Sequence, residues 1–438
     1  MTSELRHLRR RFVALTALRW LPTGITAPLL VLLLSARGLS LGTIGLLTAL
    51  YSATTFLLEL PTGGLADVLG RRGVIIGSSV VAAAASIIIA FATSPAWFAA
   101  GFMLHGLARA LDSGPLQAWY VDSVHAIDPA ADLKPGLSRS AVAESASLAL
   151  GAIAAGAVVT IAPLPPSGGP LIALSVPFLL KAGLSAVQIA ATLAWVQDAP
   201  THAGTTARAP GRATRVLARS RDAARDVPAT VARGVRIAGA SRAVRRLLVF
   251  TGALGVALAG IELLAPAHAS ALLGGETDAA GAYSVLVTAG FLGSAAGGAL
   301  APLAARLARS DARAAAFAAI GGACALAAVA APLAGVAAGA FVAFYLLLGV
   351  TGPLTESMLH AEVGARERAT MLSVQSMALQ SAALVCTAAL GAITGATSLA
   401  VGFGLTGAAL AAGGAALGRL RPGAAAEAVQ EPNHAAPR

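Results

Sequence analysis

Charge is scarce in this chain, and lysine and cysteine are almost absent. Only 12% of its 438 residues are charged and 57% are hydrophobic, whereas a soluble globular protein has about 25% charged residues. So few charges cannot cover the two or three soluble domains that this length would require, and so apolar a chain cannot be disordered. The two cysteines, Cys324 and Cys386, lie in apolar runs and predict neither a disulfide framework nor a metal site. The composition therefore indicates an integral membrane protein that crosses the bilayer many times.

Long apolar runs supply the crossings. A helix needs about 20 apolar residues to span the hydrocarbon core, and the sequence predicts twelve such helices, the sixth interrupted by Pro177 and Lys181. The predicted spans are 12–36, 41–66, 73–93, 96–122, 138–163, 171–197, 247–273, 280–306, 313–333, 335–360, 369–394 and 396–418. We therefore expect an all-α membrane protein.

Positive charge alternates along the chain with these spans. A net charge of +11 invites a nucleic-acid function, but the arginines gather at the N-terminus and after the even-numbered spans, eleven of them between Arg208 and Arg246. Cytoplasmic loops carry such an excess of arginine and lysine. The pattern predicts a multi-pass plasma membrane protein with both termini and the middle loop in the cytoplasm, the lipid bilayer as a partner, and no nucleic-acid partner.

A weak internal repeat predicts the domain organisation. Residues 113–116 read SGPL in the fourth span, and residues 351–354 read TGPL in the tenth, 238 residues later. Two pseudo-symmetric six-helix halves would place a site near the midplane between them. We expect halves at 1–197 and 247–418, a basic amphipathic linker over 198–246, and a disordered cytoplasmic tail over 419–438. Since one chain holds both halves, we expect a monomer.

The loop between the second and third spans carries the strongest motif. Residues 63–72 read GGLADVLGRR, in which glycines permit a tight turn and an aspartate can pair with the arginines. This segment resembles the signature loop of the major facilitator superfamily (MFS), Gly-x-Leu-Ala-Asp-Arg-x-Gly-Arg-Arg/Lys, and departs from it at Val68. The resemblance implies the MFS fold and secondary transport by alternating access.

The resemblance also implies a conformational latch at this loop. In the family the signature aspartate pairs with the loop arginine and with an acidic residue at the cytoplasmic end of the fourth helix, here Asp122. The trio would be Asp67, Arg71 and Asp122, and the alternative is that these charges only set topology. The complete set of predicted latch residues is Gly63, Asp67, Gly70, Arg71, Arg72 and Asp122.

Ionisable residues within the spans are candidates for proton or substrate coupling, because charge in the bilayer is costly and normally faces a cavity or a partner. Glu59 belongs to a Glu-x-Pro-Thr-Gly run, residues 59–63, that resembles a subgroup of bacterial exporters. In the fourth span we expect Asp112 to offset Arg109 at i,i+3, with His105 one turn back. Arg109 also resembles an arginine of the family's fourth helix that is linked to proton transfer.

Further interior charges complete the candidate list. Arg19 and Lys181 either face the interior or extend their charged ends to the membrane surface. Each of the acids and basic groups named here can instead have a purely structural role. The predicted coupling residues are Glu59, His105, Arg109, Asp112, Glu144, Glu262 and Glu356.

Together these features predict a secondary active transporter for a small organic compound of amphiphilic, drug-like character. We expect a proton-coupled exporter without a cofactor, driven by the proton gradient, and not an enzyme. The family's helix-five Gly-x-x-x-Gly-Pro antiporter motif is missing, since residues 150–157 read LGAIAAGA. The alternatives are uptake of a sugar or other metabolite by a facilitator or proton symporter, and, more remotely, a membrane sensor or enzyme.

Overall fold

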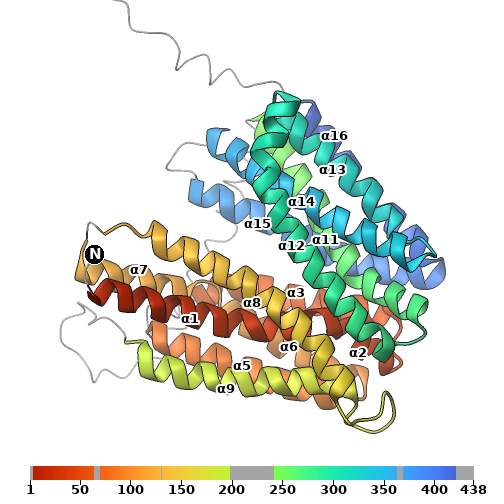
Figure 1. Ribbon diagram of the computed structural model, residues 1–438, viewed down its shortest axis with the longest axis horizontal. Coiled ribbons are helices and arrows are strands. Elements are labelled where there is room, and N and C mark those ends of the chain that lie inside the picture. The colour runs from red at the N-terminus through yellow and green to blue at the C-terminus, as the bar shows by residue number, and fades with distance from the viewer. Residues whose placement is uncertain (1–2, 64–69, 130, 198–240, 363–367, 421–438) are drawn as a thin grey trace, which may run out of the picture. The chain divides into compact units, whose positions relative to one another are not determined.

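The computed structural model describes residues 3–63, 70–129, 131–197, 241–362 and 368–420. Helices make up nearly all of this part of the chain (Figure 1). A backbone surrounded by lipid has no water to bond, so apolar segments satisfy their N–H and C=O groups within helices. The all-α prediction is therefore confirmed.

The helices of the first half follow the predicted spans, with irregular points at prolines. The first crossing changes to a short 3-10 turn, η1, where Pro28 removes a backbone donor. The elements are α1 (Ser3–Thr26), η1 (Ala27–Leu29), α2 (Leu30–Ala36), α3 (Leu41–Gly63), α5 (Arg71–Phe91), α6 (Pro95–Leu111), α7 (Pro115–Ile127), α8 (Lys134–Ile161), η2 (Ala173–Ser175) and α9 (Val176–Trp195).

In the described residues, the second half consists of six helices, and two of these helices begin after a serine cap. Ser310 and Ser398 cap two of them, since their hydroxyls accept from the backbone N–H groups of Arg313 and Val401. These helices are α11 (Arg242–Leu273), α12 (Glu276–Ala308), α13 (Asp311–Ala328), α14 (Ala334–Glu362), α15 (Arg368–Ala396) and α16 (Leu399–Gly418).

Eleven helices in the described residues are long and apolar enough to cross a membrane. The predicted continuous fourth span, 96–122, is wrong in one respect: it is broken into α6 of 17 residues and α7 of 13 residues. Gly114 adopts φ 107° between them, a backbone conformation open to glycine but strained for other residues. Pro115 then starts α7, where its missing N–H costs nothing.

The sixth span corrects a second prediction. Pro177 does not interrupt it, because it lies in the first turn of α9, where proline is tolerated. Lys181 lies within the same regular helix and its side chain is buried, with 6% exposed. Its charged end therefore does not extend to the membrane surface.

The chain divides into two compact units. The first comprises Met1–Pro228, Ala265–Phe291 and Thr387–Ala396, and the second comprises Ala229–Leu264, Leu292–Cys386 and Thr397–Arg438. In the first, α1 packs against α8 and α9, and α5 against α6 and α9. In the second, α13 packs against α14 and α16. Most of the proposed linker, at 198–240, and most of the proposed tail, at 421–438, lie outside the described residues.

Small residues set the closest helix approaches within each unit. At Gly24 of α1 a Cβ would meet the backbone of Leu148 in α8 at 2.5 Å, and at Gly151 it would meet Leu21 at 2.6 Å. In the second unit, Gly297 of α12 and Gly349 of α14 leave no room for a Cβ against each other's helix. Apolar packing between membrane helices relies on such close backbone approach.

Candidate functional site

The fourth crossing is broken between Leu111 and Pro115, so backbone N–H and C=O groups outside a regular helix lie among apolar helices. The N–H of Asp112 still donates to Ala108 O at 3.1 Å, which ends α6, and Gly114 N–H donates back to Asp112 O at 2.9 Å. Asp112 is thus the C-cap residue of α6. Interrupted helices of this kind bring polar groups to the binding sites of transporters.

An ion pair joins this break to the first crossing. Arg19 Nε of α1 donates to Asp112 Oδ2, and Arg19 Nη2 donates to the Asp112 carbonyl at 3.3 Å. The two side chains are 16% and 18% exposed. The Arg19 guanidinium also lies 4.5 Å from the centre of the Trp20 ring, a further favourable contact for a cation. The other carboxylate oxygen, Asp112 Oδ1, is buried and accepts no hydrogen bond within the described residues.

Asp112 interacts electrostatically with Arg109, but its hydrogen bonds go to another cation. Because α6 ends at Leu111, Asp112 leaves the helical path and its carboxylate bonds to Arg19 instead. Arg109 is exposed and interacts electrostatically with Asp112 and with Glu144 of α8. Glu144 is half-buried and also interacts with Arg19. Two cations and two carboxylates from three crossings therefore form one charge cluster, defined as Arg19, Arg109, Asp112 and Glu144.

His105 lies on α6 at the other side of Arg109 from Asp112. Its ring stacks on Tyr51 of α3, with 5.1 Å between ring centroids. It interacts electrostatically with Arg109 and with Lys181 of α9, two cations. His105 therefore interacts both with a member of the charge cluster and with the buried Lys181.

Part of the predicted latch is visible. Arg71 Nε lies 3.5 Å from Asp122 Oδ2, and Arg72 donates to the Leu193 carbonyl of α9 at 2.7 Å. Gly70 has φ 84° immediately before α5, which fits the turn role expected of it. Gly63 is the last residue of α3. Asp67 lies outside the described residues.

The remaining predicted coupling residues lie on other helices than the charge cluster. Glu59 is half-buried on α3. In the second unit, Glu262 of α11 interacts electrostatically with Tyr345 of α14, whose ring contacts those of Phe341 and Phe344. Glu356 is exposed on α14.

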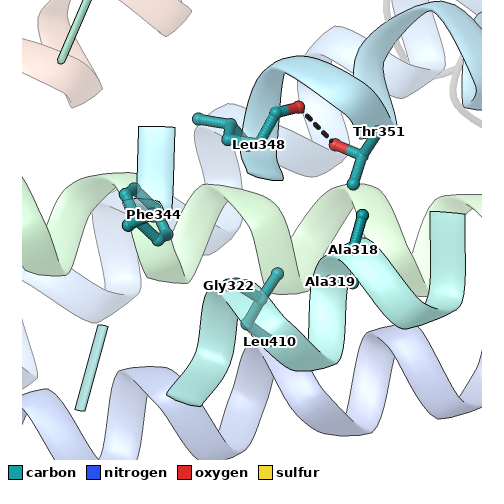
Figure 2. A pocket seen from close by; sticks show the side chains of 7 residues that line it. All are labelled: Ala318, Ala319, Gly322, Phe344, Leu348, Thr351 and Leu410. Carbon is teal, nitrogen blue, oxygen red and sulfur yellow. Dashed lines mark hydrogen bonds between the residues drawn. The ribbon is translucent and has the colours of Figure 1, made fainter. Parts of the chain in front are cut away.

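The repeated Gly-Pro-Leu segment of the second half has a different structure. There α14 continues through Pro353 as one helix. Figure 2 shows Thr351 beside a small apolar void lined by α13, α14 and α16, with its hydroxyl donating to Leu348 O at 2.8 Å. The repeat offset places Leu347 and Val350 where the first half has Arg109 and Asp112. The charge cluster therefore has no counterpart at the equivalent position.

Arg19, Tyr51 and Lys181 contribute to these contacts without being among the coupling residues predicted from the sequence. A lone interior arginine predicts a carboxylate partner on another span, and that signal was present at Arg19. Its partner, 93 residues away, could not be chosen among several interior acids without the fold.

A family model agrees with this architecture. The model described as Major Facilitator Superfamily matches residues 12–386. The chain belongs to the Major Facilitator Superfamily. No curated protein matches the chain by sequence.

Solved structures share the MFS fold at low sequence identity. A mutant of the nucleoside transporter NupG matches with a TM-score of 0.71 and 13% identity, covering 94% of this chain and 98% of that one. A mutant of the peptide transporter POT in complex with alafosfalin matches at 0.67 and 17%, covering 94% and 93%. A bacterial homologue of the human lysosomal transporter Spinster matches at 0.68 and 12%, covering 95% of each chain.

Proposed function

We propose that this MFS protein is a proton-coupled exporter of a small organic compound with amphiphilic, drug-like character. The observation that carries the proposal is the carboxylate of Asp112, which lies at a break in a membrane-spanning helix. Its Oδ2 accepts a hydrogen bond from Arg19, and its Oδ1 accepts none among the described residues. Interior charge of this kind is costly and marks substrate or proton paths. A carboxylate with an open oxygen can accept a proton.

Proton uptake would change the charge cluster in a defined way. When Asp112 is ionised, it holds Arg19, and when it is protonated, the ion pair is lost and Arg19 is released toward Glu144. Each exchange rearranges contacts among α1, α6 and α8, the helices on which or at whose end these residues lie. Alternating access requires such a change of state at the site. The pair Arg71–Asp122, with Asp67, would act as the latch of one state.

The direction and the substrate rest on other indications. Export is supported by the Glu-x-Pro-Thr-Gly run at Glu59, and an amphiphilic substrate by the low polar content of the spans. Relatives in fold include transporters of nucleosides and peptides, so uptake of a metabolite by a proton symporter is the second candidate. Because the arginines follow the even-numbered spans, the N- and C-termini would lie in the cytoplasm and the protein in the plasma membrane. Because one chain holds both halves, the protein would act as a monomer.

The test uses inside-out vesicles that contain the protein and have an acidified lumen with a pH-sensitive dye. Addition of a transported compound to the outside should release lumenal protons in the wild type. The Asp112→Asn variant cannot carry the proton at this position, and we expect at least about a hundredfold lower proton release, since a group that transfers a proton typically contributes about 10²–10⁴-fold to a rate. Amphiphilic drugs, sugars and amino acids form the panel of compounds.

A matched control shows whether the loss of any one aspartate charge is enough to reduce proton release. Asp278→Asn removes an exposed aspartate from the first turn of α12 and should leave proton release unchanged. Equal proton release by the wild type and Asp112→Asn, at equal amounts in the membrane, would reject Asp112 as the carrier. Compound-driven proton movement in the opposite direction would favour the symporter.

A further inference from the structure

Lys181 of α9 is buried in the first unit and makes no salt bridge within the described residues. Its side chain is 6% exposed. Its Nζ donates to Thr26 Oγ1 of α1 at 3.5 Å, a long and weak hydrogen bond. It also interacts electrostatically with His105 of α6. Within the described part of the chain, then, the ammonium group has one hydroxyl as a hydrogen-bond partner and lies in the electrostatic reach of His105.

This environment does not satisfy an ammonium group. Lysine has three N–H donors and no acceptor, and Thr26 offers one lone pair at long range while its own hydroxyl donates to Pro22 O at 3.1 Å. His105 adds no negative charge, and its second charged neighbour is the cation Arg109. Buried charges in proteins are normally paired. Arg19, by contrast, has its carboxylate in Asp112.

We infer that Lys181, Thr26 and His105 form an anion-binding subsite whose ligand is a carboxylate or another monoanionic group. The three side chains come from α9, α1 and α6, so a bound anion would contact three crossings of the first unit. A carboxylate would accept from the N–H groups of Lys181 that Thr26 does not engage and could displace the long Thr26 contact. His105 could donate to the same anion through its ring N–H.

The inference rests on the proposed function and narrows it, because the exported compound would carry an acidic group beside its apolar part. A small inorganic anion such as chloride has the same charge and could occupy the subsite instead. The subsite is separate from the Arg19–Asp112 pair, so substrate charge and proton would bind to different residues of the same bundle.

The lysine content makes the subsite directly observable. Lys134 and Lys181 are the two lysines of the chain, so protein made with lysine carrying ¹³C at Cε gives two lysine NMR signals. Lys134→Arg assigns them. We expect benzoate to shift the Lys181 signal saturably at constant pH and to leave the signal of Lys134, which is exposed, unchanged. Benzamide, which has the same ring and no charge, should shift neither.

A titration with chloride in the absence of benzoate distinguishes an organic carboxylate from a small inorganic anion as the ligand. A saturable chloride shift with no competition from benzoate would contradict an organic ligand. Benzoate shifts that are equal at both lysines, or do not saturate, would overturn the subsite altogether. This measurement is made on the wild-type protein and does not depend on how a variant folds.

Variants then test the affinity. Lys181→Met should weaken benzoate binding by about ten- to hundredfold, as expected for loss of a hydrogen bond to a charged group. Lys181→Arg keeps the charge and should retain most of the binding, and Lys134→Met should bind like the wild type. Unchanged benzoate binding by Lys181→Met would overturn the inference. If neutral compounds still cause proton release in vesicles with the Lys181→Met variant, the proposed export function would stand even though the anion-binding subsite is rejected.

Discussion

Single residues hold several non-helical parts of this protein in place, and Arg37 is the clearest case. Its guanidinium donates to the carbonyls of Gly169 and Pro170 in the segment between α8 and η2, to Ala90 O at 3.4 Å, and to Ser175 Oγ at 3.2 Å. Partial burial lowers the pKa of Arg37 below its ordinary value. An arginine nevertheless stays protonated in proteins, so these bonds should persist across the neutral range.

Arg37→Ala is therefore expected to destabilise the protein. The loss of charged hydrogen bonds to partly exposed carbonyls should lower the free energy of unfolding by about 1–2 kcal/mol. Thermal unfolding in detergent measures the change. Because the Arg37 side chain stays protonated throughout the neutral range, the difference from the wild type should be the same under mildly acidic and mildly basic conditions.

The conservative control is Arg37→Lys, which keeps the charge and one donor group. It should retain part of the lost stability. An Arg37→Ala protein that unfolds at the wild-type temperature would mean that the segment 162–172 is held by its own packing.

Side-chain partners inside the membrane were the least predictable feature from the sequence. The interior charges themselves were recognisable, because each is rare among apolar residues. Which charges form hydrogen bonds depends on where helices end: the spacing predicts that Asp112 offsets the charge of Arg109, and it does so, but it bonds to Arg19 because the helix stops at Leu111. The break coincides with one glycine–proline pair, and the same pair also occurs, unbroken, in α14.

At the scale of elements, the repeated segments 113–116 and 351–354 differ, because the first lies at a helix break and the second within a continuous helix. Gly114 has φ 107°, whereas Gly352 is within the regular helix α14. A Cβ added at either glycine would meet no atom of another helix within 4 Å. The two positions therefore differ in backbone conformation and not in the space that other helices leave.

Alanine should destabilise the protein more at Gly114 than at Gly352. Gly114→Ala places a Cβ in a left-handed conformation and should cost about 1–2 kcal/mol of stability, with a loss of transport if the segment straightens and draws Asp112 from Arg19. Gly352→Ala should change the stability of α14 by less than about 1 kcal/mol, because the usual gain of alanine over glycine in a helix is opposed by crowding of the new Cβ against the ring of Pro353. Thermal unfolding and the vesicle assay measure both. Stabilisation by both substitutions would indicate that α6 and α7 readily join into one helix.

The elements themselves were largely predictable, because hydrophobic length determines a membrane helix almost alone. Twelve crossings were predicted from apolar runs, and the MFS fold from the resemblance at residues 63–72. Breaks within crossings were not, since the same apolar composition suits a straight helix and an interrupted one. Pro177 shows the reverse: a proline within an apolar run predicts an interruption, yet Pro177 lies in the first turn of α9.

The whole molecule must change state to transport, and the Arg71–Asp122 pair offers a way to test the latch. The two side chains are 28% and 51% exposed, and exposed ion pairs contribute only about 0–1 kcal/mol to stability. Asp122→Asn should therefore leave the unfolding temperature nearly unchanged. If the pair holds one state of the transport cycle, proton release in vesicles should nevertheless fall by about fivefold, the lower end of the usual range for coupling between states.

The control is Asp128→Asn, which removes an exposed carboxylate immediately after the end of the same helix, α7. It should transport normally. Equal transport by Asp122→Asn and the wild type would mean that the signature charges only orient the chain in the membrane.

The 93 residues between Arg19 and Asp112 also have a consequence for biosynthesis. At about 5–20 residues per second, the ribosome needs roughly 5–20 s after making Arg19 before it has made Asp112. During that time the first crossing enters the bilayer with an arginine whose partner does not yet exist. The insertion machinery, or water within it, must accommodate this charge until the fourth crossing arrives.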